Sequence, residues 1–206
     1  MKHLFSWDSP CHLCGTAIEG RAGLCPACRR ALPRHDGKMP RLTGIDAVKV
    51  AFWYDYPLIP LVRAFKYQGA LHLADVLASG WEGLLPQQPP DCVVPVPLSR
   101  RRWRERGYNQ AHELALELGS RLGSACTPAL LRQRHTAPQA GLSAQARATN
   151  VARAFCARTP LRGLRVALVD DVLTTGATLE AAAQALRDAG ARQVEAWVVA
   201  RAVLPL

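Results

Sequence analysis

Two adjacent carboxylates and a group of hydroxyl-bearing residues follow a hydrophobic run near the C-terminus. The run at 165–169 is typical of a buried strand, and Asp170 and Asp171 come directly after it. The loop that leads into the next helical pattern is Thr174, Thr175, Gly176, Ala177 and Thr178. Loop amides and a helix N-terminus form an anion site, and glycine lets the backbone approach the anion. The pattern predicts a site that binds a sugar 5′-phosphate, with the sugar hydroxyls donating hydrogen bonds to the carboxylates. The alternative is a capped turn that binds nothing.

Four of the seven cysteines form two Cys-x-x-Cys pairs, namely Cys11, Cys14, Cys25 and Cys28. Two such pairs place four thiolates for a tetrahedral Zn²⁺ shell, and Gly15 suits the tight turn that is needed. Four protein ligands leave no open position, so the ion is expected to be structural. Disulfides are the alternative, but a reducing compartment and an odd cysteine count disfavour them. Zinc would also stabilise residues 1–35, which hold few apolar side chains.

The other cysteines are isolated in the sequence. Cys92, Cys126 and Cys156 have no partner at metal-binding spacing, and we interpret them as structural. Two histidines near the first pair, His3 and His12, are alternative zinc ligands.

Arginine is concentrated in one third of the chain. The formal net charge is +10, and residues 98–165 hold 13 arginines and no lysine against three glutamates. Such a field attracts polyanions, that is, phosphate esters, nucleic acid or acidic lipid. Simple replacement of lysine by arginine on solvated faces is the alternative, but it does not account for the clustering.

Length and composition limit the class of protein. The chain has 206 residues, 49% of them hydrophobic and 20% charged. These values fit one α/β domain with a small appendage and exclude disorder for most of the chain. No apolar run reaches the roughly 18 residues of a membrane span, and the N-terminal stretch is too short for a secretory signal. A cytoplasmic protein is therefore expected.

The elements that must position these groups alternate between strand and helix. We expect strands at 47–54, 93–96, 165–169 and 193–203, and helices from 61 onward, at 108–122 and at 178–189. A strand, a helix and a further strand at this spacing indicate a right-handed crossover in a parallel sheet. A zinc module with its linker is predicted over 1–40, and an α/β domain over 41–206. The polar, aperiodic segment 132–164 is typical of a functional lid.

Longer motifs give a family resemblance. The stretch 166–178 resembles the phosphoribosyl-pyrophosphate (PRPP) motif of type I phosphoribosyltransferases. Together with the four-cysteine head, the motifs at 65–69, 95–98, 104–110 and 134–139 look like those of the ComF family, which includes the competence protein of natural transformation and GntX-like homologues. The resemblance implies a type I phosphoribosyltransferase-like parallel sheet flanked by helices, with a small N-terminal zinc-ribbon-like module.

The resemblance also implies a reaction and a set of roles. PRPP would bind with Mg²⁺, and its phosphoribosyl group would pass to an unknown acceptor. A guanidinium grips phosphate oxygens with two hydrogen bonds, so arginines opposite the carboxylates are candidates to hold the pyrophosphate. Asn109 and Gln110 would position a substrate or support the loop. The candidate catalytic residues are Asp170, Asp171, Arg104, Arg106 and Lys66.

A mobile hood and a nucleic-acid surface compete for the remaining basic residues. The segment 132–153 resembles the hood that closes over PRPP, with Arg134, Thr136, Gln139, Arg147 and Asn150 as its polar members. The same arginines would otherwise contact single-stranded DNA, with Trp103 or Tyr108 stacking on bases. Arg100, Arg101 and Arg102 are further candidates for such contacts. The alternative function is thus a non-catalytic competence factor that binds single-stranded DNA and other competence proteins.

Overall fold

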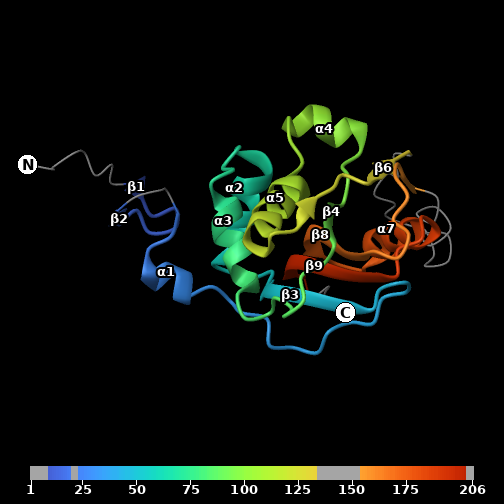
Figure 1. Cartoon of the computed structure of the whole chain (residues 1–206). Helices are drawn as coiled ribbons and strands as arrows, with labels where there is room; N and C mark the ends of the chain where they lie inside the picture. Colours follow the sequence, from blue (N-terminus) through green and yellow to red (C-terminus); the bar gives the residue numbers. More distant parts are fainter. Residues whose placement is uncertain (1–8, 20–22, 134–153, 203–206) are drawn as a thin grey trace, which may run out of the picture.

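A parallel sheet of five strands forms the centre of the molecule (Figure 1). A computed structural model describes residues 9–19, 23–133 and 154–202. The strands run in the order β3-β9-β8-β4-β5, and every neighbouring pair is parallel. Their bounds are Ala47–Trp53 for β3, Gln193–Arg201 for β9, Arg165–Leu173 for β8, Cys92–Pro95 for β4 and Ala125–Cys126 for β5. The predicted fold class is confirmed.

Helices cover both faces of the sheet, because side chains alternate along each central strand. Ala167 and Val169 of β8 join one apolar cluster, with α2 (Leu58–Tyr67), α3 (Leu73–Ala78) and α5 (Gln110–Leu122). Val166 and Leu168 join the other, with α7 (Ala177–Asp188). The short helix η1 (Ser79–Trp81) follows α3.

Three elements differ from the sequence predictions. Helix α2 begins at Leu58 rather than at 61, because Pro60 lies in the first turn, where its missing N–H is not needed. Strand β8 continues to Leu173, so Asp170 and Asp171 lie within its last residues rather than after it. A helix that we did not predict, α4 (Arg100–Arg106), begins at the N-cap Ser99 and ends at Gly107, whose φ is 78°. It lacks the apolar stripe that predicts a helix.

Strands β6 (Leu130–Arg132) and β7 (Phe155–Ala157) form an antiparallel pair on either side of 134–153. The predicted hood residues Arg134, Thr136, Gln139, Arg147 and Asn150 lie in that segment, outside the described residues. In the described ranges, no helix is long and apolar enough to cross a membrane.

The N-terminal module packs against the helices of the main domain. It consists of the antiparallel strands β1 (Ser9–Pro10) and β2 (Ala17–Ile18) and the helix α1 (Pro26–Arg30). Leu24 and Leu32 belong to the apolar cluster that contains α3. Arg29 donates to Ser79 Oγ at 2.8 Å, so a side-chain contact joins the module to η1. The module therefore shares the core of the main domain. The boundary near residue 40 stays a prediction.

Candidate functional site

A cleft of about 490 Å³ lies at the carboxyl end of β8. The strand contributes Asp170 and Asp171, the loop after it contributes Thr174, and the first turn of α7 contributes Thr178. Cationic side chains from α2, α4 and β6 also line the cleft: Lys66, Arg102, Arg106 and Arg132. The structure thus brings together parts of the chain that are far apart in the sequence. Carboxylate and hydroxyl oxygens and cationic nitrogens line the same cleft.

The two carboxylates have different surroundings. Asp171 is 6% exposed, and its Oδ1 lies 3.0 Å from Lys66 Nζ. Its other oxygen, Oδ2, has no hydrogen-bond partner among the described residues. Asp170 Oδ1 accepts a hydrogen bond from the Asp171 amide at 2.9 Å. Burial, and then the charge of Asp171, raise the pKa of Asp170 to about 7, although Lys66 and Arg132 oppose the rise.

This raised pKa predicts that Asp170 makes the ligand-free chain less stable as the pH rises. Between the ordinary value of 3.8 and about 7, the folded state binds a proton that the unfolded state has lost. The contribution to stability therefore decreases as the pH rises through this window. An amide at this position does not titrate, so Asp170→Asn should raise the melting temperature relative to wild type at about pH 8 and change it little at about pH 4. A difference that stays constant over this range in thermal melts would contradict the assignment.

The loop after β8 is held close to its neighbours. Gly176 has a φ of 87°, and a Cβ built there would lie 2.4 Å from a methyl carbon of Leu42. The positive φ favours glycine, and a larger residue would also displace the Leu42 side chain. Helix α7 begins at the next residue, so its N-terminus, with its partial positive charge, lies beside the cleft. Thr175 Oγ1 accepts from the Ala177 amide at 3.5 Å, and the Thr175 side chain is exposed.

The arginines that reach the cleft come from two places. Arg106 packs over the Tyr67 ring at 4.8 Å, and its Nη2 lies 3.4 Å from the Tyr67 hydroxyl. Its buried Nη1 has no hydrogen-bond partner among the described residues. Arg132 packs over the Phe155 ring at 5.4 Å. Burial lowers the pKa of Arg132, and the positive charge of Arg102 lowers it further. Arg132 is the first residue of the segment that resembles the hood, but it is not among the residues predicted for the site, because no motif marks it and only strand pairing brings it to the cleft.

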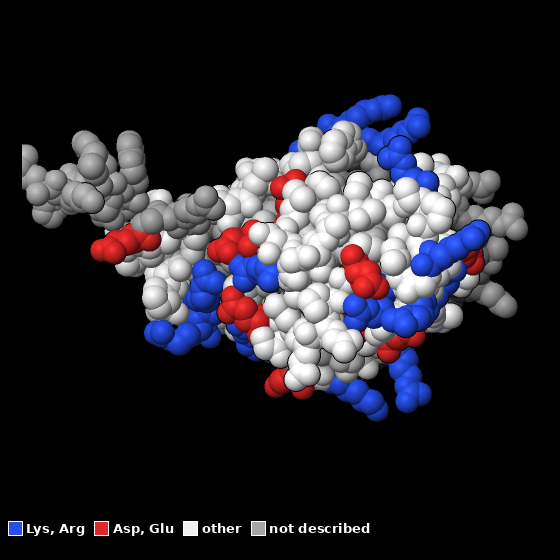
Figure 2. Space-filling view, viewed as in Figure 1, with Lys and Arg blue, Asp and Glu red and all other residues white. Residues whose placement is uncertain are grey.

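Other predicted basic residues are exposed on α4 and do not line the cleft. Arg101 pairs with Glu105 at 2.7 Å on the helix surface. Trp103 is 52% exposed, and Arg100 and Arg104 are also exposed. Figure 2 shows basic side chains gathered over the part of the molecule where α4 projects. The basic residues predicted for the site therefore divide into those that line the cleft and a second group that is exposed on α4.

The four N-terminal cysteines form a compact cluster. The sulfur atoms of Cys11, Cys14, Cys25 and Cys28 all lie within 4.8 Å of one another, and no disulfide joins them. Tetrahedral Zn²⁺ with Zn–S bonds of about 2.3 Å would place its sulfurs about 3.8 Å apart. Cys14 and Cys25 are already 3.8 Å apart. The cluster can hold a metal ion such as zinc.

The environment of the thiols also fits a cation. The Cys25 amide donates to Cys11 Sγ at 3.3 Å. Burial raises the pKa of Cys11, but hydrogen bonds from backbone amides, first that of Cys25, outweigh this effect and lower it to about 6. Hydrogen bonding with Cys14, followed by burial, raises the pKa of Cys28 to about 12. Four thiols so close together do not all ionise without a compensating positive charge, which a divalent metal supplies.

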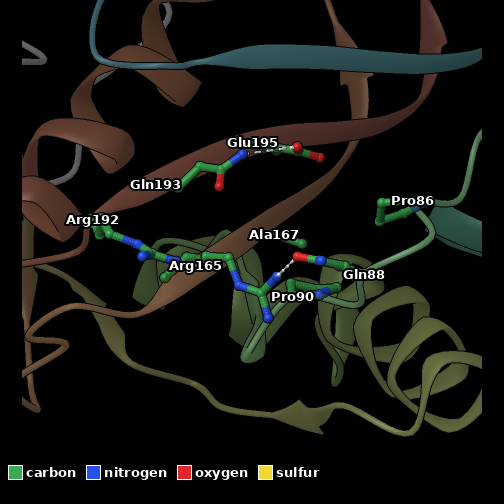
Figure 3. A pocket seen from close by; sticks show the side chains of 9 residues that line it. Pro86, Gln88, Pro90, Arg165, Ala167, Arg192, Gln193 and Glu195 are labelled. Atoms are coloured by element: carbon green, nitrogen blue, oxygen red, sulfur yellow. Dashed lines mark hydrogen bonds between the residues drawn. The ribbon is translucent and has the colours of Figure 1, made fainter.

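A second hollow, of about 300 Å³, lies at the opposite end of β8 and β9 (Figure 3). Arg165 Nη2 pairs with Asp91 Oδ1 at 2.9 Å, and hydrogen bonds from Arg165 hold the pKa of Asp91 at about 2. Glu195 pairs with Lys49 at 2.8 Å. Among the charged side chains that line this hollow, Arg192 alone has no ion-pair partner in the described ranges. The hollow is therefore a poorer anion site than the cleft.

Comparison with known proteins gives the class of the main domain. Residues 104–202 match the family described as "Phosphoribosyl transferase domain". The match includes β8, the loop with Gly176 and α7. The fold and this match define a protein with a phosphoribosyltransferase domain.

Relatives that match nearly the whole chain give the family. "DNA utilization protein YhgH" of Salmonella typhimurium is 37% identical over 93% of this chain and 89% of its own. "Competence protein F" of Haemophilus influenzae is 32% identical over 93% and 84%. "Competence protein ComFC" of Bacillus subtilis is 27% identical over 89% and 80%. The chain belongs to the ComF family.

Proposed function

We propose that the cleft binds PRPP together with Mg²⁺ and transfers its phosphoribosyl group to an acceptor. The observation that carries this proposal is the convergence on one cleft of the Asp170–Asp171 pair, the hydroxyls of Thr174 and Thr178 at the start of α7, and cationic side chains. A sugar that carries a phosphate at one end and a diphosphate at the other needs these three kinds of group. The family match to phosphoribosyltransferases supports the proposal.

The positions of the groups give each a role. The 5′-phosphate would bind at the loop and the α7 N-terminus, and the ribose hydroxyls would donate to Asp170 and Asp171. The pyrophosphate would lie against Arg106 and Lys66. In the reaction, the bond between C1 and the pyrophosphate oxygen breaks, its electron pair leaves with the pyrophosphate, and the acceptor forms a bond to C1. Cations that bind the leaving group more tightly as its charge grows would accelerate this step.

The donor set of the cleft also fits Mg²⁺. This ion prefers oxygen ligands and usually keeps several waters. Asp171 Oδ2 is a buried acceptor without a partner among the described residues, and Asp170 lines the same cleft. When bound with the substrate, the ion would supply charge neutralisation for the pyrophosphate.

Thermal melts test this function. PRPP with Mg²⁺ at about one hundred times its Kd should stabilise the chain by about 2.7 kcal/mol. In a chain of this size the melting temperature should then rise by about 5–10 °C. Glucose 6-phosphate with Mg²⁺ is the matched control for a nonspecific sugar phosphate. No rise at millimolar PRPP would overturn the proposal.

The exposed group on α4 favours a second function, binding of single-stranded DNA. Helix α4 presents Arg100, Arg101, Arg102 and Arg104 beside the half-exposed ring of Trp103, and phosphates and bases bind such groups. The names of the relatives, which refer to competence and DNA utilization, agree with a role of this kind. Apart from Arg102, which also lines the cleft, the two functions use different side chains and can coexist.

Fluorescence anisotropy with a labelled oligonucleotide, measured over a series of salt concentrations, tests this second function. Replacing Arg100, Arg101 and Arg102 by alanine should weaken binding and reduce its salt dependence. Replacing Arg63 and Arg192, which are exposed elsewhere, is the matched control. Affinity that is indifferent to salt, or unchanged by the α4 substitutions, would rule the function out.

We further propose that residues 1–40 act as a zinc-binding module and its linker, attached to a transferase domain over 41–206. The close cysteine cluster supports the first part, and the five-stranded sheet supports the second.

A further inference from the structure

Gln110 is a buried amide whose oxygen has no hydrogen-bond partner among the described residues. It is the first residue of α5 and is 4% exposed. The preceding residue, Asn109, fixes its position: Asn109 Nδ2 donates to the Val96 carbonyl at 3.0 Å, and its Oδ1 accepts from the Ala111 amide at 3.1 Å. Gln110 Oε1, by contrast, accepts no hydrogen bond from any described residue.

The neighbours of Gln110 in the cleft are charged rather than apolar. Lys66, Arg106 and Asp171 line the same space. Two of these also have a buried atom without a described partner, namely the donor Arg106 Nη1 and the acceptor Asp171 Oδ2. Leaving one buried polar atom unpaired costs free energy, so three such atoms around one cleft indicate a ligand that pairs with them.

The pattern of donors and acceptors limits the chemistry of that ligand. Arg106 offers hydrogens to an anion, and Asp171 accepts hydrogens from hydroxyl groups. Gln110 can do both, because its amide carries a donor and an acceptor side by side. A ligand that has a phosphate and a hydroxyl on neighbouring atoms satisfies all three residues. In PRPP this combination occurs at C1 and C2.

We propose that Gln110 binds PRPP at C1 and C2, where Nε2 donates to a pyrophosphate oxygen and Oε1 accepts from the 2-hydroxyl. This inference rests on the proposed function and adds a specificity-determining residue to it. A carboxylate at this position would repel the pyrophosphate, and an ammonium would offer the hydroxyl no acceptor. Gln110 thus distinguishes a C1-diphosphorylated sugar from ribose 5-phosphate, which lacks the diphosphate.

Binding of two ligands to four proteins tests the proposal. We would titrate PRPP with Mg²⁺, and separately ribose 5-phosphate, into the wild type, Gln110→Leu, Gln110→Glu and the control Gln87→Ala, whose side chain is exposed. Gln110→Leu should lower the affinity for PRPP about ten- to hundredfold, because it removes a hydrogen bond to a charged group. Gln110→Glu should lower this affinity further, because its carboxylate repels the pyrophosphate. Ribose 5-phosphate has the 2-hydroxyl but no diphosphate, so its affinity for Gln110→Leu should fall less, by about two- to tenfold. Gln87→Ala should leave both affinities unchanged.

A stability readout separates this role from a structural one. Because Gln110→Leu removes an unpaired buried amide, the ligand-free variant should melt no lower than the wild type. A lower melting temperature, or an equal loss of affinity for both ligands, would show that Gln110 supports the fold and would overturn the inference. Unchanged PRPP affinity in both variants would also overturn it. If the wild type itself binds no PRPP, the proposed function fails as a whole.

Discussion

Removing the metal from the four-cysteine cluster is expected to lower the thermal stability of the whole chain. The cluster is continuous with the core, because Cys11, Leu24 and Cys25 belong to the same apolar cluster as the buried residues of α2 and α3. Arg34 extends the contact by donating to the Gly80 carbonyl at 2.6 Å. Loosening the module therefore exposes part of the main core, and unfolding should remain a single transition.

The size of this effect follows from ligand linkage. Zinc at about a thousand times its Kd stabilises the folded chain by about 4 kcal/mol, so its removal should lower the melting temperature by about 8–16 °C in a chain of this length. The measurement is differential scanning calorimetry of the zinc-loaded wild type, of a chelated sample and of Cys11→Ser. Cys156→Ser, which changes an isolated cysteine, is the control. Two separate transitions, with the larger one unchanged by chelation, would show that the module does not support the domain.

Loss of Lys66 should be the most destabilising single change in the cleft. Lys66 pairs with the buried Asp171 at 3.0 Å, and their side chains are only 16% and 8% exposed. Lys66→Met leaves a buried carboxylate without its counter-charge, which typically costs about 3–5 kcal/mol of unfolding free energy. The double variant Lys66→Met, Asp171→Asn removes both charges and should recover most of this loss.

Urea denaturation of the two single variants and the double variant measures this coupling. Arg101→Ala breaks an exposed ion pair on α4 and is the control, for which we expect no measurable change. If Lys66→Met and Arg101→Ala are equally stable, or if the double variant is no more stable than Lys66→Met, the ion pair does not couple α2 to β8.

Parts of the site could be predicted from the sequence because their signals are local. The hydrophobic run of β8, the glycine-containing loop and the helix after it are consecutive, so their order places the loop amides and the helix N-terminus beside the cleft. The cysteine spacing likewise determines the cluster, since each Cys-x-x-Cys pair lies on one tight turn. The family motifs added the class of the domain, which the relatives confirm.

Other parts depend on contacts between distant residues. The Lys66–Asp171 pair exists because α2 packs on the face of β8 toward which Asp171 points. Arg132 reaches the cleft through the pairing of β6 with β7, which no motif marks. Gly176 packs against the Leu42 side chain, which is 134 positions earlier in the chain. Helix α4 was not predicted because its stability comes from its caps rather than from an apolar stripe.

Titration of PRPP, with Mg²⁺ present, into the wild type and into the double variant Asp170→Asn, Asp171→Asn tests the central claim most directly. The two asparagines keep the size of the side chains but remove the charged acceptors for the ribose hydroxyls. Calorimetry should show binding at one site per wild-type chain and a loss of affinity of at least about a hundredfold in the variant, since hydrogen bonds to charged groups contribute about 1.5–3 kcal/mol each. Equal affinity in the two proteins, or no binding to the wild type, would contradict the account.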